Sequence, residues 1–111
     1  MNIVVLAGEL SSAPQVRELP SGDSLVTYEV TTRNIDKKAE SVPVVWFQAP
    51  ASAADLDPHE PVVVTGRVRR RFFRSRGVTA SRTEVVAHGV LRSGQRRRIE
   101  GALAAAMAEA G

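Results

Sequence analysis

Arginine residues are concentrated in the second half of the segment 61–76, PVVVTGRVRRRFFRSR, and occupy every second position from 67 to 71. Successive side chains of an extended strand point to opposite faces. One face of this strand would therefore carry three guanidinium groups followed by a phenyl ring, from Arg67, Arg69, Arg71 and Phe73. Spaced guanidinium groups suit the repeated charge of a polyanion, and a ring beside them offers a flat surface for a base. The segment predicts a site for single-stranded nucleic acid, although a solvated strand edge would also carry such charges.

The alternation also sorts the aromatic residues. Phe73 has the parity of the arginines and Phe72 the opposite parity, so we expect only Phe73 to face a ligand. Within residues 41–48, Trp46 shares its parity with Val44 and is predicted to lie in the core. Phe47 has the other parity, which argues against burial in the core.

Positive charge is concentrated in one third of the chain. Residues 1–66 carry four basic and nine acidic side chains, whereas residues 67–98 carry eleven arginines and one glutamate, and the whole chain has a net charge of +3. Clustering of this kind indicates a polyanionic partner. Weaker candidates for phosphate contacts are seven other basic residues, Arg17, Arg33, Lys37, Lys38, Arg74, Arg76 and Arg82.

Other classes of function find little support. The absence of cysteine excludes disulfides and thiolate metal sites, and His59 and His88 have no ligand spacing, so we expect neither metal nor cofactor. No phosphate loop, nucleophile elbow or paired-carboxylate cluster is present, so we expect no enzymatic activity. The apolar run at residues 3–7 is too short for a signal peptide or a membrane span, which predicts a cytoplasmic, nucleoid-associated protein.

The periodicity predicts an all-β domain. Strands are expected at residues 2–10, 24–33, 41–48, from 61 onward and at 81–91, with a turn at 20–23, a short helix within 49–60 and a loop at 75–80. In the fourth strand, we expect Val62, Val64 and Val68 to face the core. Five short strands fit a Greek-key barrel of the oligonucleotide-binding (OB) type, and a small sandwich fits the periodicity nearly as well.

The chain is expected to divide at residue 93. Residues 1–93 would form the OB-fold single-stranded nucleic-acid-binding domain. Residues 94–111 are alanine-rich, and apolar side chains recur there at spacings of three and four, as in Ile99, Leu103 and Met107. This spacing predicts a C-terminal helix with one apolar face.

Several segments together resemble the bacterial single-stranded DNA-binding proteins. These are NIVVLAGEL, VRELPSG and VTT in the first half, and VVVTGRVRRRFF and SRTEVVAHGV in the second, covering roughly residues 2–93. The resemblance implies an OB barrel, a homotetramer, and binding of single strands with little sequence preference in DNA replication, repair or recombination. It also places the base-stacking aromatics at Phe47 and Phe73.

The chain departs from this family pattern at three places. Ser41 stands where the family commonly has a tryptophan, and the family's loop aromatic falls near Ile35 or Asp36. Each lost platform should weaken binding by about 1 to 3 kcal/mol. The family's linker and acidic tip are replaced by the alanine-rich segment, so we do not expect an acidic tail to recruit repair enzymes.

Three alternatives stay open at this level. A primosomal accessory protein has the same type of barrel and would be a dimer instead of a tetramer. A protein-interaction module would use the barrel as a scaffold and bind its partner through Ile99, Leu103 and Met107 of the C-terminal helix. RNA would fit as the ligand as well as DNA, because nothing in the sequence indicates recognition of a 2′-hydroxyl.

Overall fold

The computed structural model describes residues 1–33 and 36–110. These residues form six strands, a short 3₁₀ helix between the fourth and fifth strands, and a C-terminal α-helix. In chain order the elements are β1 Val4–Leu10, β2 Gln15–Glu18, β3 Ser24–Arg33, β4 Ala39–Phe47, η1 Ala51–Ala54, β5 Pro61–Ser75, β6 Val78–Arg92 and α1 Arg96–Ala110.

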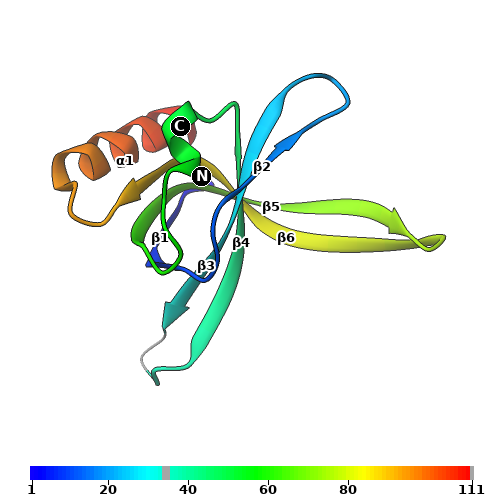
Figure 1. Cartoon of the computed structure of the whole chain (residues 1–111), viewed down its shortest axis with the longest axis horizontal. Coiled ribbons are helices and arrows are strands. Elements are labelled where there is room, and N and C mark those ends of the chain that lie inside the picture. The colour runs from blue at the N-terminus through cyan, green and yellow to red at the C-terminus, as the bar shows by residue number, and fades with distance from the viewer. Residues whose placement is uncertain (34–35, 111) are drawn as a thin grey trace.

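Five of the strands close into a barrel (Figure 1). The hydrogen-bonded order is β1-β5-β6-β4-β3, and β1 returns to β3 through the pairs Glu9 with Thr31 and Leu10 with Val30. The pair β4 and β6 is parallel, whereas the other pairs are antiparallel. The strand β2 extends the sheet on the far side of β3. The structure confirms the predicted OB fold with a C-terminal helix.

Two glycines allow the close backbone contacts that the barrel needs. A Cβ atom at Gly8 would lie 2.3 Å from the carbonyl oxygen of Thr31, where β1 leaves β5 and meets β3. A Cβ atom at Gly66 would lie 2.2 Å from the carbonyl oxygen of Val86, next to the register shift between β5 and β6. A side chain at either position would collide with backbone that cannot move aside cheaply, which is a common reason for glycine inside a strand.

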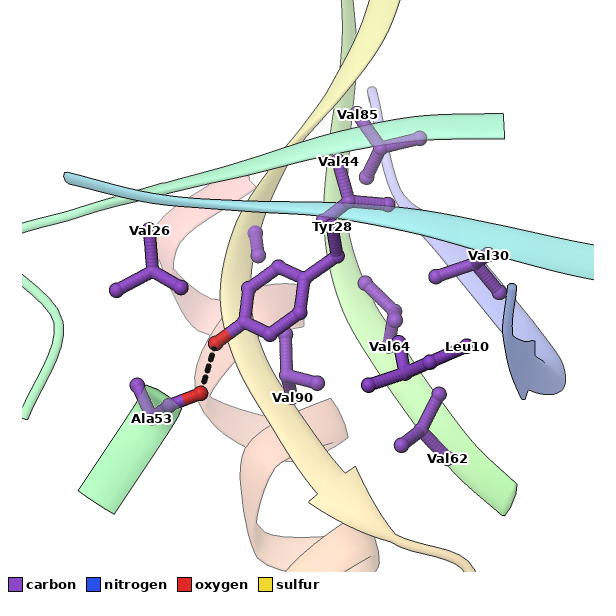
Figure 2. Close-up of a cluster of buried hydrophobic side chains, with 11 residues drawn as sticks. Leu10, Val26, Tyr28, Val30, Val44, Ala53, Val62, Val64, Val85 and Val90 are labelled. Atoms are coloured by element: carbon purple, nitrogen blue, oxygen red, sulfur yellow. Dashed lines mark hydrogen bonds between the residues drawn. The ribbon is translucent and has the colours of Figure 1, made fainter. Parts of the chain in front are cut away.

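The core lies inside the barrel and is built from alternate residues of the strands. Leu10, Val30, Val44, Val62 and Val64 are fully buried there (Figure 2). Trp46 packs against this cluster, as its parity predicted.

Tyr28 connects the core to η1. Its hydroxyl donates a hydrogen bond of 2.7 Å to the carbonyl oxygen of Ala53, and both residues are buried (Figure 2). Burial raises the pKa of the Tyr28 hydroxyl well above its ordinary value, because the phenolate would lose its hydration. The group therefore remains a protonated donor at neutral pH and fixes η1 against the barrel.

The strands β5 and β6 continue beyond the barrel as a long hairpin (Figure 1). The loop expected at residues 75–80 is wrong: strand pairing reaches Ser75 and Val78, and only Arg76 and Gly77 form the turn. Both turn residues have positive φ, 54° and 78°, which is the turn geometry whose twist matches that of paired strands. The prediction that Val68 faces the core is also wrong. Val68 is 42% exposed although its cross-strand partner Val85 is buried, because Val68 lies beyond Gly66, the last residue of β5 that pairs with β1.

The helix α1 packs against β5 and β6 on the side of the barrel away from the hairpin tip (Figure 1). Ala106 is buried, and Ala102 lies over Gly89, where an added Cβ atom would make an ordinary contact with it at 3.6 Å. His88 Nδ1 lies 2.8 Å from an oxygen of Glu109, which holds the C-terminal part of α1 on β6. Met107 stays 48% exposed.

Candidate nucleic-acid interface

A groove of about 540 Å³ lies between the β2-β3-β4 part of the sheet and the base of the β5–β6 hairpin. The sheet contributes mostly apolar and neutral side chains together with Arg17 and Glu29, and the hairpin contributes charged side chains. The lining of the groove includes Arg17, Thr27, Glu29, Val45, Phe47, Arg69, Arg71, Arg82 and Glu84. The wall formed by the sheet is therefore mainly apolar, and the wall formed by the hairpin is mainly cationic.

The register of the hairpin decides which side chains reach this groove. Arg69 is paired with Glu84, Arg71 with Arg82, and Phe73 with Ala80. Side chains directly opposite each other in an antiparallel pair lie on the same face. These residues therefore share one face of the hairpin, which we call the groove face: Arg69, Arg71, Phe73, Ala80, Arg82 and Glu84.

Two guanidinium groups of the groove face lie between two phenyl rings, one at Phe47 in β4 and one at Phe73 in β5. The guanidinium carbon of Arg69 lies 5.1 Å from the centre of the Phe47 ring, and that of Arg71 lies 5.1 Å from the centre of the Phe73 ring. Glu84 joins the two halves, because Oε2 accepts hydrogen bonds from Arg69 and Oε1 accepts one of 3.4 Å from Arg71. We call this set, Phe47, Arg69, Glu84, Arg71 and Phe73, the groove ladder.

Glu84 is only 6% exposed, so its carboxylate depends on the two arginines. A buried carboxylate without partners is strongly disfavoured. Arg69 and Arg71 are held in fixed positions in return, and each guanidinium keeps N–H groups that Glu84 does not use. Such fixed cations lose little side-chain freedom when they bind a phosphate.

A second chain of polar contacts holds Arg82 beside the ladder. Arg82 Nη2 lies 3.3 Å from Oε1 of Glu29, and the Ser41 hydroxyl donates a hydrogen bond of 2.9 Å to Oε2 of the same carboxylate. Ser41 stands at the position where the family that this chain resembles commonly has a tryptophan. In this chain it orients Glu29, which in turn positions Arg82.

The structure brings together only part of the predicted site. Phe47, Arg69, Arg71 and Arg82 line the groove together with Arg17, and Phe73 continues the ladder toward the hairpin tip. Arg67 instead lines a neighbouring cavity of about 420 Å³, which it shares with Phe47, His88 and Glu109. Phe47 therefore borders both cavities.

The remaining candidates lie elsewhere. Arg74 is on the opposite face of the hairpin and donates a hydrogen bond of 2.9 Å to the carbonyl of Gly77, and Arg76 is in the turn. Arg33 ends β3 opposite Ala39, and neither cavity is lined by it, Lys37 or Lys38. Ile35, at the predicted loop position, lies outside the described residues, and Asp36 is exposed.

Glu84, Glu29 and Ser41 were not recognised as parts of the site from the sequence. Glu84 is the single acidic residue among the eleven arginines of segment 67–98, and this isolation is a signal that could have identified it. Its pairing with Arg69 depends on the position of the turn, which was expected elsewhere. Ser41 and Glu29 carry no such signal, because their contact depends on the β3–β4 register.

Within residues 1–33 and 36–110, no cluster of three or more His, Asp or Glu side chains is arranged to hold a metal ion. No helix in that part of the chain has the length and apolar character needed to cross a bilayer.

Comparison with known proteins adds two findings. Residues 1–93 match the family described as "Single-strand binding protein family". The chain is also 32% identical to "Single-stranded DNA-binding protein 2" of Listeria innocua, in an alignment that covers 92% of this chain and 70% of that relative. The matched region contains β1 to β6 and all members of the groove ladder.

Proposed function

Because the chain belongs to the single-strand binding protein family, we propose that it coats single-stranded DNA without sequence preference and without catalysing a reaction. The observation that carries this proposal is the groove ladder, in which two rings are joined by two arginines clamped on one carboxylate. Stacking on rings is indifferent to base identity, because every base has a π face. Arginine–phosphate contacts are equally indifferent to sequence.

The groove offers separate contacts for the bases and for the phosphates of the DNA strand. Bases stack on Phe47 and Phe73, while phosphates lie along Arg69, Arg71 and Arg82, with Arg67, Arg76, Arg74 and Arg33 as outlying contacts. Glu29 and Glu84 lie close to these arginines and repel a phosphate that approaches from the side of either carboxylate. The sugar–phosphate backbone would therefore run along the side of the arginines that faces away from the two carboxylates.

The biological setting of the proposal follows from the family. We place the protein in DNA replication, repair or recombination, in the cytoplasm with the nucleoid, and as a homotetramer or alternatively a dimer. Residues 1–93 are proposed to be the binding unit, and residues 94–111 an extension that docks on it. This docking leaves Met107 as the most exposed of the three apolar side chains offered to a protein partner, since Ile99 and Leu103 are half-buried.

Fluorescence titration with oligo-dT at increasing salt concentration tests the proposal. Arginine–phosphate contacts release counterions, so the logarithm of the binding constant should fall linearly with the logarithm of salt concentration. Duplex DNA and single-stranded RNA of the same length are the comparison ligands in a parallel gel-shift panel. Undetectable binding at low ionic strength, or binding that salt does not weaken, would refute the proposal. Equal affinity for RNA would leave the mechanism intact and widen the ligand class.

A further inference from the structure

The face of the hairpin opposite the groove repeats the arginine–phenylalanine arrangement. Arg70 is paired with Thr83, Phe72 with Ser81, and Arg74 with Thr79. The guanidinium carbon of Arg70 lies 5.6 Å from the centre of the Phe72 ring. We call Arg70, Phe72 and Arg74 the back face. The hairpin thus carries a ring with an adjacent guanidinium on each of its two sides.

The two faces differ in how their charges are compensated. On the groove face, Arg69 and Arg71 are ion-paired with Glu84, and Arg82 with Glu29. On the back face, Arg70 donates a hydrogen bond of 3.2 Å to the Ser81 hydroxyl and Arg74 one to the Gly77 carbonyl, and both acceptors are neutral. Within residues 1–33 and 36–110, neither arginine is ion-paired. The back face therefore holds uncompensated positive charge.

The ring on the back face is also the more accessible one. Phe72 is 66% exposed, compared with 36% for Phe73. Its cross-strand neighbours are short hydroxyl side chains, which cannot cover it. A large exposed ring beside unpaired cations has the composition of a stacking platform with phosphate contacts.

We infer that the back face is a second surface for single-stranded nucleic acid, so that one strand can fill the groove, pass the hairpin tip and return along the other side. This inference rests on the proposed function. Charge complementarity favours a polynucleotide as the occupant over a second copy of this chain. In a symmetric contact, a second copy would bring its own Arg70 and Arg74 against this face, and like charges would meet.

The back face has one ring and two arginines, so by itself it should hold a separate short strand only weakly. A strand already bound in the groove presents its own continuation at a high effective concentration. The back face should therefore strengthen the binding of long strands and leave the binding of short ones unchanged. This dependence on length separates it from the groove.

The experiment measures the affinity of Phe72→Ala for oligo-dT of about 8 nucleotides, which is within the usual site size of one OB fold, and of about 30 nucleotides, which exceeds it. We expect binding of the long strand to weaken by about 5-fold, the low end of the loss for one stacked base, and binding of the short strand to match that of the wild type. Arg70→Gln should reduce the salt dependence for the long strand only, by about one phosphate contact. Met107→Ala, which removes an exposed apolar side chain from α1, is the control and should change neither affinity.

Each other outcome has a defined meaning. Wild-type affinity of Phe72→Ala for both strands overturns the inference, and so does an equal loss for both, which would make Phe72 part of the groove site. A change in molecular mass by light scattering in Phe72→Ala also overturns it, because the back face would then be a contact between copies. If the wild type binds neither strand, the proposed function itself has failed, which differs from all three results.

Discussion

Arg69 donates two hydrogen bonds to a single carboxylate oxygen of Glu84, 3.0 Å from Nε and 2.8 Å from Nη2. The other carboxylate oxygen remains for Arg71. One buried carboxylate on β6 therefore fixes the positions of two arginines on β5. The arginine row in the sequence becomes an ordered surface through this contact.

Glu84→Gln should lower the free energy of unfolding by about 1 kcal/mol. Hydrogen bonds to charged groups contribute more than this, but Arg69 and Arg71 are 30% and 46% exposed, so solvent screens the interaction. Urea unfolding measures the change. Glu29→Gln is the matched control, since Glu29 and Arg82 are both about half exposed and should contribute less than about 0.5 kcal/mol. Equal losses in the two variants would contradict the role given to Glu84.

Phe73→Ala should weaken binding of oligo-dT by about 1 to 3 kcal/mol, because one stacking platform is lost. Phe47→Ala should have an effect of similar size. Phe73→Leu separates stacking from simple apolar contact, since leucine keeps the apolar surface and lacks the π face. Fluorescence titration measures all three variants. Wild-type affinity of Phe73→Leu would show that the ring acts only as apolar surface.

Gly8→Ala should destabilise the barrel by about 3 kcal/mol, since the new methyl group would meet the Thr31 carbonyl oxygen at 2.3 Å. The backbone on both sides is held by strand pairing and has no room to relax. Thermal and urea unfolding measure the loss. Gly94→Ala is the control, because a Cβ atom there meets nothing within 4 Å, and its stability should stay within about 0.5 kcal/mol of the wild type. An unchanged midpoint for Gly8→Ala would contradict the barrel closure described here.

Tyr28→Phe should cost about 1 kcal/mol at neutral pH, through loss of the hydrogen bond to the Ala53 carbonyl. Tyr28 also makes stability depend on pH. Its pKa is raised on folding from an ordinary value of 10.0, so the contribution is complete below that pH and is lost as pH rises above it.

Tyr28 is the single tyrosine of the chain, so tyrosinate absorbance reports its ionisation directly. We expect ionisation in the alkaline range to coincide with unfolding, and the wild type to lose more stability there than Tyr28→Phe. Ionisation near pH 10 in the folded protein would contradict the burial of this hydroxyl.

Alternation in the sequence was sufficient to predict an all-β domain and the opposite orientations of Trp46 and Phe47, whereas a small sandwich fitted the periodicity nearly as well as the barrel. It was not sufficient for the hairpin. Arg76 adopts a positive φ that arginine seldom takes, so the two-residue turn looked like part of a longer loop. That error hid the pairing of Arg69 with Glu84, which depends on the register of the hairpin. The exposure of Val68 was missed for another reason, because it depends on where the pairing of β1 with β5 ends.

Contacts between strands far apart in the sequence were also beyond prediction. The series Ser41, Glu29 and Arg82 crosses three strands, and nothing in the local pattern of any one of them indicates the other two. The orientation of Arg74, in contrast, depends only on its own strand. Arg74 belongs to the same charged run as Arg71, but strand parity places it on the opposite face.

Photocrosslinking of a bromodeoxyuridine-substituted single strand, followed by residue-level mapping of the adducts, tests the central claim most directly. A strand that lies in the groove brings its bases against the rings of the groove ladder, so the account predicts adducts at Phe47 and Phe73. Adducts confined to α1 or to β1, with none at either ring, would contradict it.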